Sequence, residues 1–224
     1  MRNKQATCYT LSMPKIVDHN AQKEKVAHAA WRVIHQHGLE YASVRNIAEE
    51  AGLSSGSLRH YFATQSELFA FAMKLVTQRV NERISRISFT GDVLKDAPLL
   101  VDEILPLEEE TRQEMEVWFA FVVKSFSDPT LGSLRSQVDE DMRRLFSTIV
   151  HALVQQELAP LQLDQELETE RFYGLIDGLA MHAVMRPEKL TPDLMRSVVK
   201  RHLYSICKPE IAAACLSGRD PKQP

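Results

Sequence analysis

Residues 43–62 read SVRNIAEEAGLSSGSLRHYF, and this stretch decides how the chain folds. Ser43 is a good N-cap for a helix over residues 44–51, because its side-chain oxygen can accept a hydrogen bond from a free N–H of the first turn. Gly52 can adopt the positive φ that a tight turn demands, and a second short helix is expected over residues 55–61. The contacts between the two helices are expected from Ile47, Ala51, Leu53, Leu58 and Tyr61. The pattern predicts a helix-turn-helix unit, whose second helix fits the major groove of DNA.

Helical periodicity continues on both sides of this unit, and strand-like alternation of polar and apolar residues is scarce. Thr64 and Glu67 have the spacing of a capping box, which marks the start of a long helix. Together with the pair above, helices are expected over residues 20–37, 65–87, 98–105, 108–126, 130–156, 166–185 and 191–207. The sequence therefore predicts an all-α protein.

The chain divides into four parts by this pattern. We expect an N-terminal extension or arm (1–18), a three-helix domain containing the helix-turn-helix (19–64), a C-terminal helical domain (65–210) and a polar tail (211–224). The pattern lapses at residues 88–92, where the long helix that joins both domains ends. Met13 is a second possible start of translation, so residues 1–12 are either an upstream extension or a mobile arm.

Charge is distributed unevenly along the chain, although the net charge of the 224 residues is only −3. Residues 1–90 carry 12 Lys and Arg against 7 Asp and Glu, whereas the remaining residues carry 15 against 23. A basic N-terminal part joined to an acidic C-terminal part indicates that the first part meets a polyanion.

The cysteines exclude some classes of protein. Cys8, Cys207 and Cys215 are far apart, so neither a disulfide framework nor a zinc ribbon is expected, and reduced thiols favour a cytoplasmic protein. The chain has no apolar run of 18 residues, so we expect no membrane span.

Polar residues around the second short helix are candidates for DNA contact. Arg59 is the strongest, because arginine binds guanine O6 and N7 and no helical neighbour offers it an acidic partner. Serine hydroxyls and free N–H groups suit phosphate oxygens; capping is the alternative role for the serines, a simple surface position for His60, and a core position for Tyr61. The DNA-binding candidates are Ser43, Arg45, Ser54, Ser55, Ser57, Arg59, His60, Tyr61 and Gln65.

Residues 29–69, AAWRVIHQHGLEYASVRNIAEEAGLSSGSLRHYFATQSELF, resemble the DNA-binding domain of the TetR family of bacterial transcriptional regulators. The similarity lies in Ala29-Ala30, Gly38, Ser43-Val44, Ile47-Ala48, Ala51-Gly52, Ser54, Gly56, Leu58, Tyr61-Phe62 and Glu67-Leu68. The resemblance implies a homodimer with a variable C-terminal domain that binds a small effector and dimerises. Most such proteins are repressors that a ligand releases from an operator of double-stranded DNA.

Two positions depart from the family pattern. Arg59 stands where the family often has tyrosine, which would alter base or phosphate contacts. Gln65 stands where a phosphate-binding lysine is common; glutamine can donate a hydrogen bond but releases no counterion, so a weaker dependence of DNA binding on salt is expected.

The segment of residues 115–126, MEVWFAFVVKSF, is apolar nearly all round, which is typical of a helix buried on several sides. Such a helix could line a cavity for an apolar or cationic effector, since aromatic faces attract cations; dense core packing is the alternative for each residue. The ligand-binding candidates are Met115, Trp118, Phe119, Phe121, Met142, Phe146, Phe172, Met181 and His182.

The last two expected helices carry an apolar stripe, and Gly174 and Gly178 leave a groove that another helix can approach. The family resemblance implies that these helices pair with their copies in a four-helix dimer interface, and packing within one protomer is the alternative. The interface candidates are Phe172, Leu175, Leu179, Ala183, Leu194 and Val198.

Other functions have weaker support in the sequence. His28, His35 and His37 could suggest a metal site, but they lack partners at the usual ligand spacing. No nucleophile elbow, P-loop or dinucleotide motif is present, so we expect no catalytic residue, metal or cofactor. The interpretation is a homodimeric repressor released by a small molecule; a helical adaptor or small-molecule-binding protein without DNA binding, and an enzyme built on a helical bundle, are the alternatives.

Overall fold

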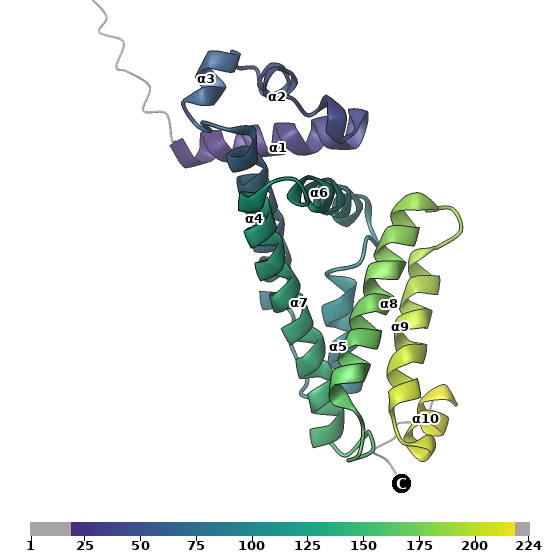
Figure 1. Ribbon diagram of the computed structural model, residues 1–224. Helices are drawn as coiled ribbons and strands as arrows, with labels where there is room; N and C mark the ends of the chain where they lie inside the picture. The colour runs from purple at the N-terminus through teal and green to yellow at the C-terminus, as the bar shows by residue number, and fades with distance from the viewer. Residues whose placement is uncertain (1–18, 218–224) are drawn as a thin grey trace, which may run out of the picture.

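The computed structural model describes residues 19–217, and every regular element among them is a helix (Figure 1), which confirms the predicted fold class. The expected arm (1–18) and the last part of the expected tail (218–224) lie outside the described residues. The elements are α1 (His19–His37), the 3₁₀ helix η1 (Leu39–Tyr41), α2 (Val44–Glu50), α3 (Ser55–Arg59), α4 (Gln65–Ser85), α5 (Val93–Asp102), α6 (Glu109–Ser125), α7 (Pro129–Gln155), α8 (Gln165–Met185), α9 (Pro192–Ile206) and α10 (Pro209–Leu216).

Two segments differ from the sequence-based expectation. The helix α5 begins at Val93 rather than near residue 98, because the Asp92 side chain caps it and Pro98 is accommodated inside it. Residues 211–216, expected in a polar tail, instead belong to α10, which Pro209 opens and which packs on α9. Proline at the first position of a helix has no N–H to satisfy, so it starts a helix as readily as it ends one.

The predicted turn after α2 and the predicted cap of α4 are confirmed. Gly38 and Gly52 have φ values of 81° and 69°, in the left-handed region that favours glycine. The Thr64 side chain accepts from the Glu67 N–H, as the capping pattern predicts. The return bond differs, because the Glu67 carboxylate accepts from the N–H of Ala63 at 2.9 Å rather than from that of Thr64.

The first core surrounds the face of α1 that carries Val26, Ala30 and Ile34, and it includes residues from α2, α3 and α4. It also includes Val117 and Phe121 of α6, so α6 packs directly against α1. Figure 1 shows α6 lying between α1 and the rest of the C-terminal half. The three-helix domain is therefore anchored through α6 as well as through the covalent link into α4.

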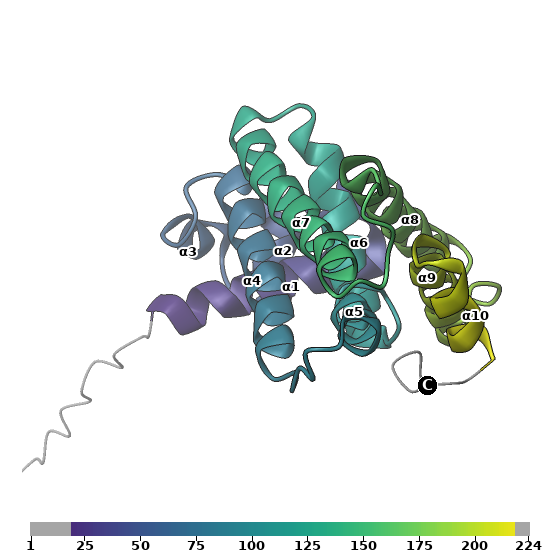
Figure 2. The ribbon, with the colours of Figure 1, turned by 90° about the horizontal axis from the view of Figure 1, so that it is seen from below.

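The second core is built by α5, α7, α8 and α9 around Phe146, Leu153 and Phe172, all fully buried. The helices α8 and α9 run side by side at the edge of the molecule in both views (Figures 1 and 2). The arrangement leaves α4, α6, α7 and α8 around a space between the two cores.

Candidate DNA interface and ligand cavity

The helix-turn-helix unit, α2 with α3, lies at the end of the molecule that is farthest from α8 and α9 (Figure 1). Ser43 caps α2 by accepting the Asn46 N–H at 3.2 Å, and Ser54 caps α3 by accepting the Ser57 N–H at 3.0 Å. The capping role weighed for these serines is therefore confirmed. Contact of their hydroxyls with phosphate stays a prediction.

The side chains around α3 divide into anchors and exposed groups. Leu58 is 1% exposed and fixes the helix to the first core. Ser55, Arg59 and His60 are exposed on and just after α3, as is Arg45 on α2. This placement leaves cationic and hydrogen-bonding groups free to meet a surface outside the protomer.

Tyr61 and Gln65 take roles inside the fold. Tyr61 is half-buried, with its ring 4.8 Å from that of His19. The Gln65 side chain donates to the carbonyl of Ala42 at 2.6 Å, which braces the start of α4 against the turn before α2. One N–H of the Gln65 amide is thus already used, and its second remains for the predicted phosphate contact.

A cavity of about 430 Å³ lies between α4, α6, α7 and α8. Three of the nine ligand candidates line it: Met115 and Trp118 from α6 and Met142 from α7. A volume of this order suits a small organic molecule, since ligand cavities commonly measure roughly 300–1,000 Å³.

The other six ligand candidates do not line this cavity. Phe121 of α6 is part of the first core, while Phe146 and Phe172 fill the second core with their ring centroids 4.9 Å apart. Phe119 packs against the second core on another face of α6. Met181 and His182 are exposed on α8. The four phenylalanines among the candidates therefore pack in or against the cores, which was the alternative weighed from the sequence.

One wall of the cavity comes from α4, and none of its residues is among the ligand candidates predicted from the sequence. Met73, Val76, Val80 and Ile84 line it from one side of this helix. Their spacing of three and four residues puts them on one face, and that periodicity was the available signal. The first core uses Met73 and Val76 as well, so α4 contacts the DNA-binding core and the cavity with neighbouring side chains.

Carboxyl groups give the cavity its charge, since Glu114, Asp141 and Asp177 line it and its described lining includes no Lys, Arg or His. Asp177 keeps part of its surface open to solvent. Burial of the rest, together with repulsion from Asp139, raises the pKa of Asp177 to about 6. Tyr173, also in the lining, donates its hydroxyl to Asp139 at 3.0 Å. The acidic lining favours a cationic guest.

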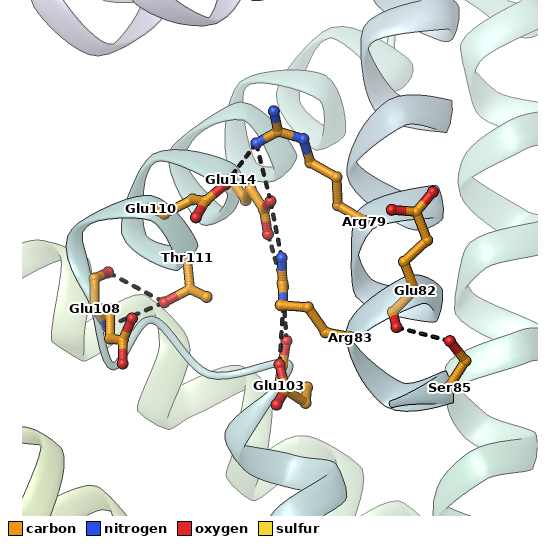
Figure 3. A network of polar contacts seen from close by, with 9 residues as sticks. All are labelled: Arg79, Glu82, Arg83, Ser85, Glu103, Glu108, Glu110, Thr111 and Glu114. Carbon is orange, nitrogen blue, oxygen red and sulfur yellow. Dashed lines mark hydrogen bonds and ion pairs between the residues drawn. The ribbon is translucent and has the colours of Figure 1, made fainter. Parts of the chain in front are cut away.

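Glu114 is the buried member of this set, with 4% exposure, and it belongs to a cluster of charges between α4, α5 and α6 (Figure 3). Arg83 holds its two carboxylate oxygens at 3.1 and 2.8 Å and also bonds Glu103 at 2.9 Å. Burial works against the charge of Arg83, but the bonds to Glu114 and Glu103 outweigh it and raise the pKa of the guanidinium. Arg79 bonds Glu110 at 2.8 Å on the other side of the cluster.

The predicted dimer residues separate into two groups. Phe172, Leu179 and Ala183 are buried in the second core, so the stripe they form packs within the protomer. Leu175, Leu194 and Val198 keep exposed surface on α8 and α9. A Cβ added at Gly174 or Gly178 meets nothing within 4 Å in the protomer. The surface of α8 and α9 with these two glycines and the three partly exposed residues is called the α8–α9 face below.

The N-terminal histidines serve within the fold. His35 bonds Glu116 of α6 at 2.5 Å, and His28 packs edge-on against Trp31. Within residues 19–217, no three His, Cys, Asp or Glu side chains gather as a metal site requires. The described helices also include none with the length and apolarity needed to cross a membrane.

Two family models match the chain. Residues 26–71 match the model described as bacterial regulatory proteins of the tetR family, and residues 96–208 match that of the BetI-type transcriptional repressor C-terminal domain. The HTH-type transcriptional regulator PksA of Bacillus subtilis (strain 168) is 43% identical over 197 residues, which span 87% of this chain and 94% of that protein. BetI of Stenotrophomonas maltophilia (strain R551-3) is 30% identical over 169 residues, spanning 75% of this chain and 83% of BetI.

Solved structures share the same architecture. A transcriptional regulator from Rhodococcus sp. Rha1 superposes with a TM-score of 0.73 at 28% identity, covering 82% of this chain and 95% of that one. A regulator from Saccharomonospora viridis, solved in complex with choline, superposes with a TM-score of 0.70 at 21% identity, covering 80% and 94%. At 21% identity, the similarity to the regulator from Saccharomonospora viridis shows a shared fold alone.

Proposed function

Because the chain belongs to the TetR family of bacterial transcriptional regulators, we propose that it binds an operator as a homodimer and that a small cation in the cavity releases it. The single observation that supports this proposal best is that α4 connects the helix-turn-helix core to the wall of the cavity. The relatives are named as transcriptional regulators, and we propose no catalytic activity. A protein that acts on bacterial DNA would work in the cytoplasm.

The proposed DNA contact follows from the exposed groups on α3. Arg59 and His60 would face base edges or phosphates in the major groove, while Arg45 and Ser55 would contact the backbone. A dimer presents two such helices, and two half-sites about 34–36 Å apart give the affinity that one helix lacks. The neutral Gln65 at the start of α4 would keep the dependence on salt below that expected with a lysine.

The proposed control has two states. Without ligand the dimer holds its two α3 helices at the spacing of the operator, and the ligand binds better to a conformer with another spacing. A coupling free energy of about 1–3 kcal/mol changes DNA affinity about 5- to 150-fold, which is enough for regulation. The match of residues 96–208 to a BetI-type repressor domain supports release by ligand as the direction.

The ligand is proposed to be a small cation with an apolar body. Asp141 and Asp177 supply negative charge, and they lie in the same lining as Glu114, whose own charge Arg83 balances. Trp118 and Tyr173 supply aromatic surface. Aromatic faces and carboxylates are the groups that recognise quaternary ammonium ions. The structural neighbour that holds choline supports this class of ligand.

Replacing Trp118 with alanine should weaken choline binding about 2- to 30-fold, because a cation–π contact contributes roughly 0.5–2 kcal/mol. Operator affinity without choline should change less than choline affinity, since Trp118 lies on α6 and touches the DNA-binding part only by packing against the first core. Isothermal calorimetry measures the first quantity and fluorescence anisotropy the second. Trp118→Phe keeps an aromatic face and should lose less. Choline affinity equal to that of the wild type would remove Trp118 from the binding site.

Choline binding should also depend on pH through Asp177, whose pKa is raised to about 6. The carboxyl is neutral below that pH and charged above it, so affinity for a cation should rise with pH. Lowering the pH from about 7.5 to 5 should weaken binding up to about tenfold if one carboxylate is required. The Asp177→Asn variant should bind weakly and lose this pH dependence; a wild-type profile that is flat would contradict the assignment.

A further inference from the structure

Arg79 of α4 touches both domains through one guanidinium. On the α6 side its Nη1 bonds Glu110 at 2.8 Å and lies 3.7 Å from a Glu114 oxygen. On the α1 side its Cζ lies 4.8 Å from the ring centroid of Trp31, and its Nη2 lies 3.4 Å from His28 Nε2. A single cation is thus shared between the acidic edge of the cavity and the helix that carries the DNA-binding unit.

Glu114 is the carboxylate through which a ligand would reach Arg79. It lines the cavity, it is 4% exposed, and its charge is balanced by arginines on α4. A second cation beside such a carboxylate competes for its charge and repels the arginines. This effect is strong where the charges are shielded from water, and weak at a surface.

The two arginines of the cluster differ in how firmly they are held. Arg83 makes four hydrogen bonds to Glu103 and Glu114, all within the C-terminal half. Arg79 makes one short bond to Glu110, whose side chain is 67% exposed, and only the longer contact with Glu114. Figure 3 shows the two arginines on the same face of α4, converging on Glu114 from either side. Arg79 is therefore the one that a new charge displaces more readily, and it is the one that touches α1.

We propose that Arg79 couples the cavity to the DNA-binding unit: a cation bound beside Glu114 displaces the Arg79 guanidinium and loosens its contact with His28 and Trp31. The helix α1, freed at this point from α4 and α6, then changes its angle and carries α2 and α3 with it. This inference rests on the proposed function for the class of ligand. Among the described residues, His35 of α1 also contacts α6 through Glu116 and Glu109, and neither of these carboxylates belongs to the cavity lining.

A neutral His28 fits this arrangement. Burial first, and then the charge of Arg79, lower the pKa of His28. A neutral imidazole can accept the Arg79 N–H at Nε2, whereas an imidazolium cannot. The contact thus requires both an unprotonated His28 and an undisplaced Arg79.

The two tryptophans of the chain can report separately on choline binding in the cavity and on the effect of that binding at α1. Trp118 lines the cavity, while Trp31 lies under Arg79. The Trp31→Phe variant leaves Trp118 as the reporter of choline binding, and Trp118→Phe leaves Trp31 as the reporter of Arg79. Titration with choline chloride, against sodium chloride at equal ionic strength, should change the emission of both reporters with saturation. Adding Arg79→Met should abolish the Trp31 response and preserve that of Trp118.

Operator affinity gives a second readout. With a duplex selected from random DNA by the wild-type protein, saturating choline should weaken binding about 5- to 150-fold. In Arg79→Met this ratio should fall below about twofold, and affinity without choline should already be reduced, because the contact that holds α1 is missing. Lys74→Met removes an exposed cation from the same helix and should leave both quantities as in the wild type. Circular dichroism and the melting temperature show whether each variant is folded.

The outcomes distinguish this inference from the function on which it rests. If choline changes the emission of Trp118 but not that of Trp31, the coupling role of Arg79 is refuted and the cation site stands. An Arg79→Met variant that keeps the wild-type ratio of operator affinities with and without choline would have the same meaning. A Trp118 reporter silent at saturating choline would count against the proposed cation site. The choline-free comparison of Arg79→Met with Lys74→Met would still decide the role of Arg79, since equal operator affinity in the two variants would refute it.

Discussion

Replacing Arg59 with alanine should weaken binding to the operator about 5- to 150-fold, which corresponds to roughly 1–3 kcal/mol for a bidentate contact with guanine. Arg59 is the last residue of α3 and is exposed, while its neighbour Leu58 anchors the helix in the core. The substitution therefore removes a contact outside the protomer without opening a cavity inside it. Fluorescence anisotropy with the selected duplex measures the change.

The matched variant Arg59→Lys separates charge from geometry. Lysine keeps the cation but lacks the planar fork, so it should retain binding to random DNA and lose preference for the operator. Both variants should remain dimeric, with the melting temperature of the wild type. If Arg59→Ala instead dissociates the dimer or unfolds it, the residue has a structural role and the assignment of α3 as the reading helix loses its main support.

Replacing Gly174 and Gly178 together with leucine should dissociate the dimer while leaving the protomer folded. Neither glycine has an atom within 4 Å of an added Cβ in the protomer, so a side chain can leave the helix there without a clash at its first carbon. Leucine also favours a helix over glycine by nearly 1 kcal/mol per residue, which should preserve α8. In a dimer whose protomers meet through the α8–α9 face, however, two leucines on each protomer would hold the paired helices apart.

Sedimentation velocity measures the expected shift from dimer to monomer, and operator affinity should fall with it because one half-site alone binds weakly. The control is Ser147→Leu, which places the same side chain at an exposed position on α7. A double variant that remains dimeric with native operator affinity would show that the protomers meet elsewhere.

The helix-turn-helix was predictable from the sequence because its signals are local. Ser43, Gly52 and Ser54 act within a few residues of their own positions, and each has the predicted cap or turn in the structure. The apolar periodicity of α7, α8 and α9 is likewise a local signal, because it is carried by residues a few positions apart in the sequence. These elements could be located to within a residue or two without knowledge of what they touch.

The cavity was only partly predictable because it depends on which helix covers each face. Residues 115–126 are apolar nearly all round, so periodicity could not separate Trp118, which lines the cavity, from Phe121, which fills the first core. The same ambiguity assigned Phe172 to a dimer interface, although α7 and α9 bury it within the protomer. The contact of Arg79 with Trp31 joins helices far apart in the sequence and has no local signal.

Purified protein should be examined by sedimentation velocity with a labelled operator duplex, without ligand, at low salt and at about 200 mM salt. We expect a dimer that binds one duplex per two protomers and loses affinity as salt rises. A monomer that leaves the duplex unbound even at low salt would contradict this expectation.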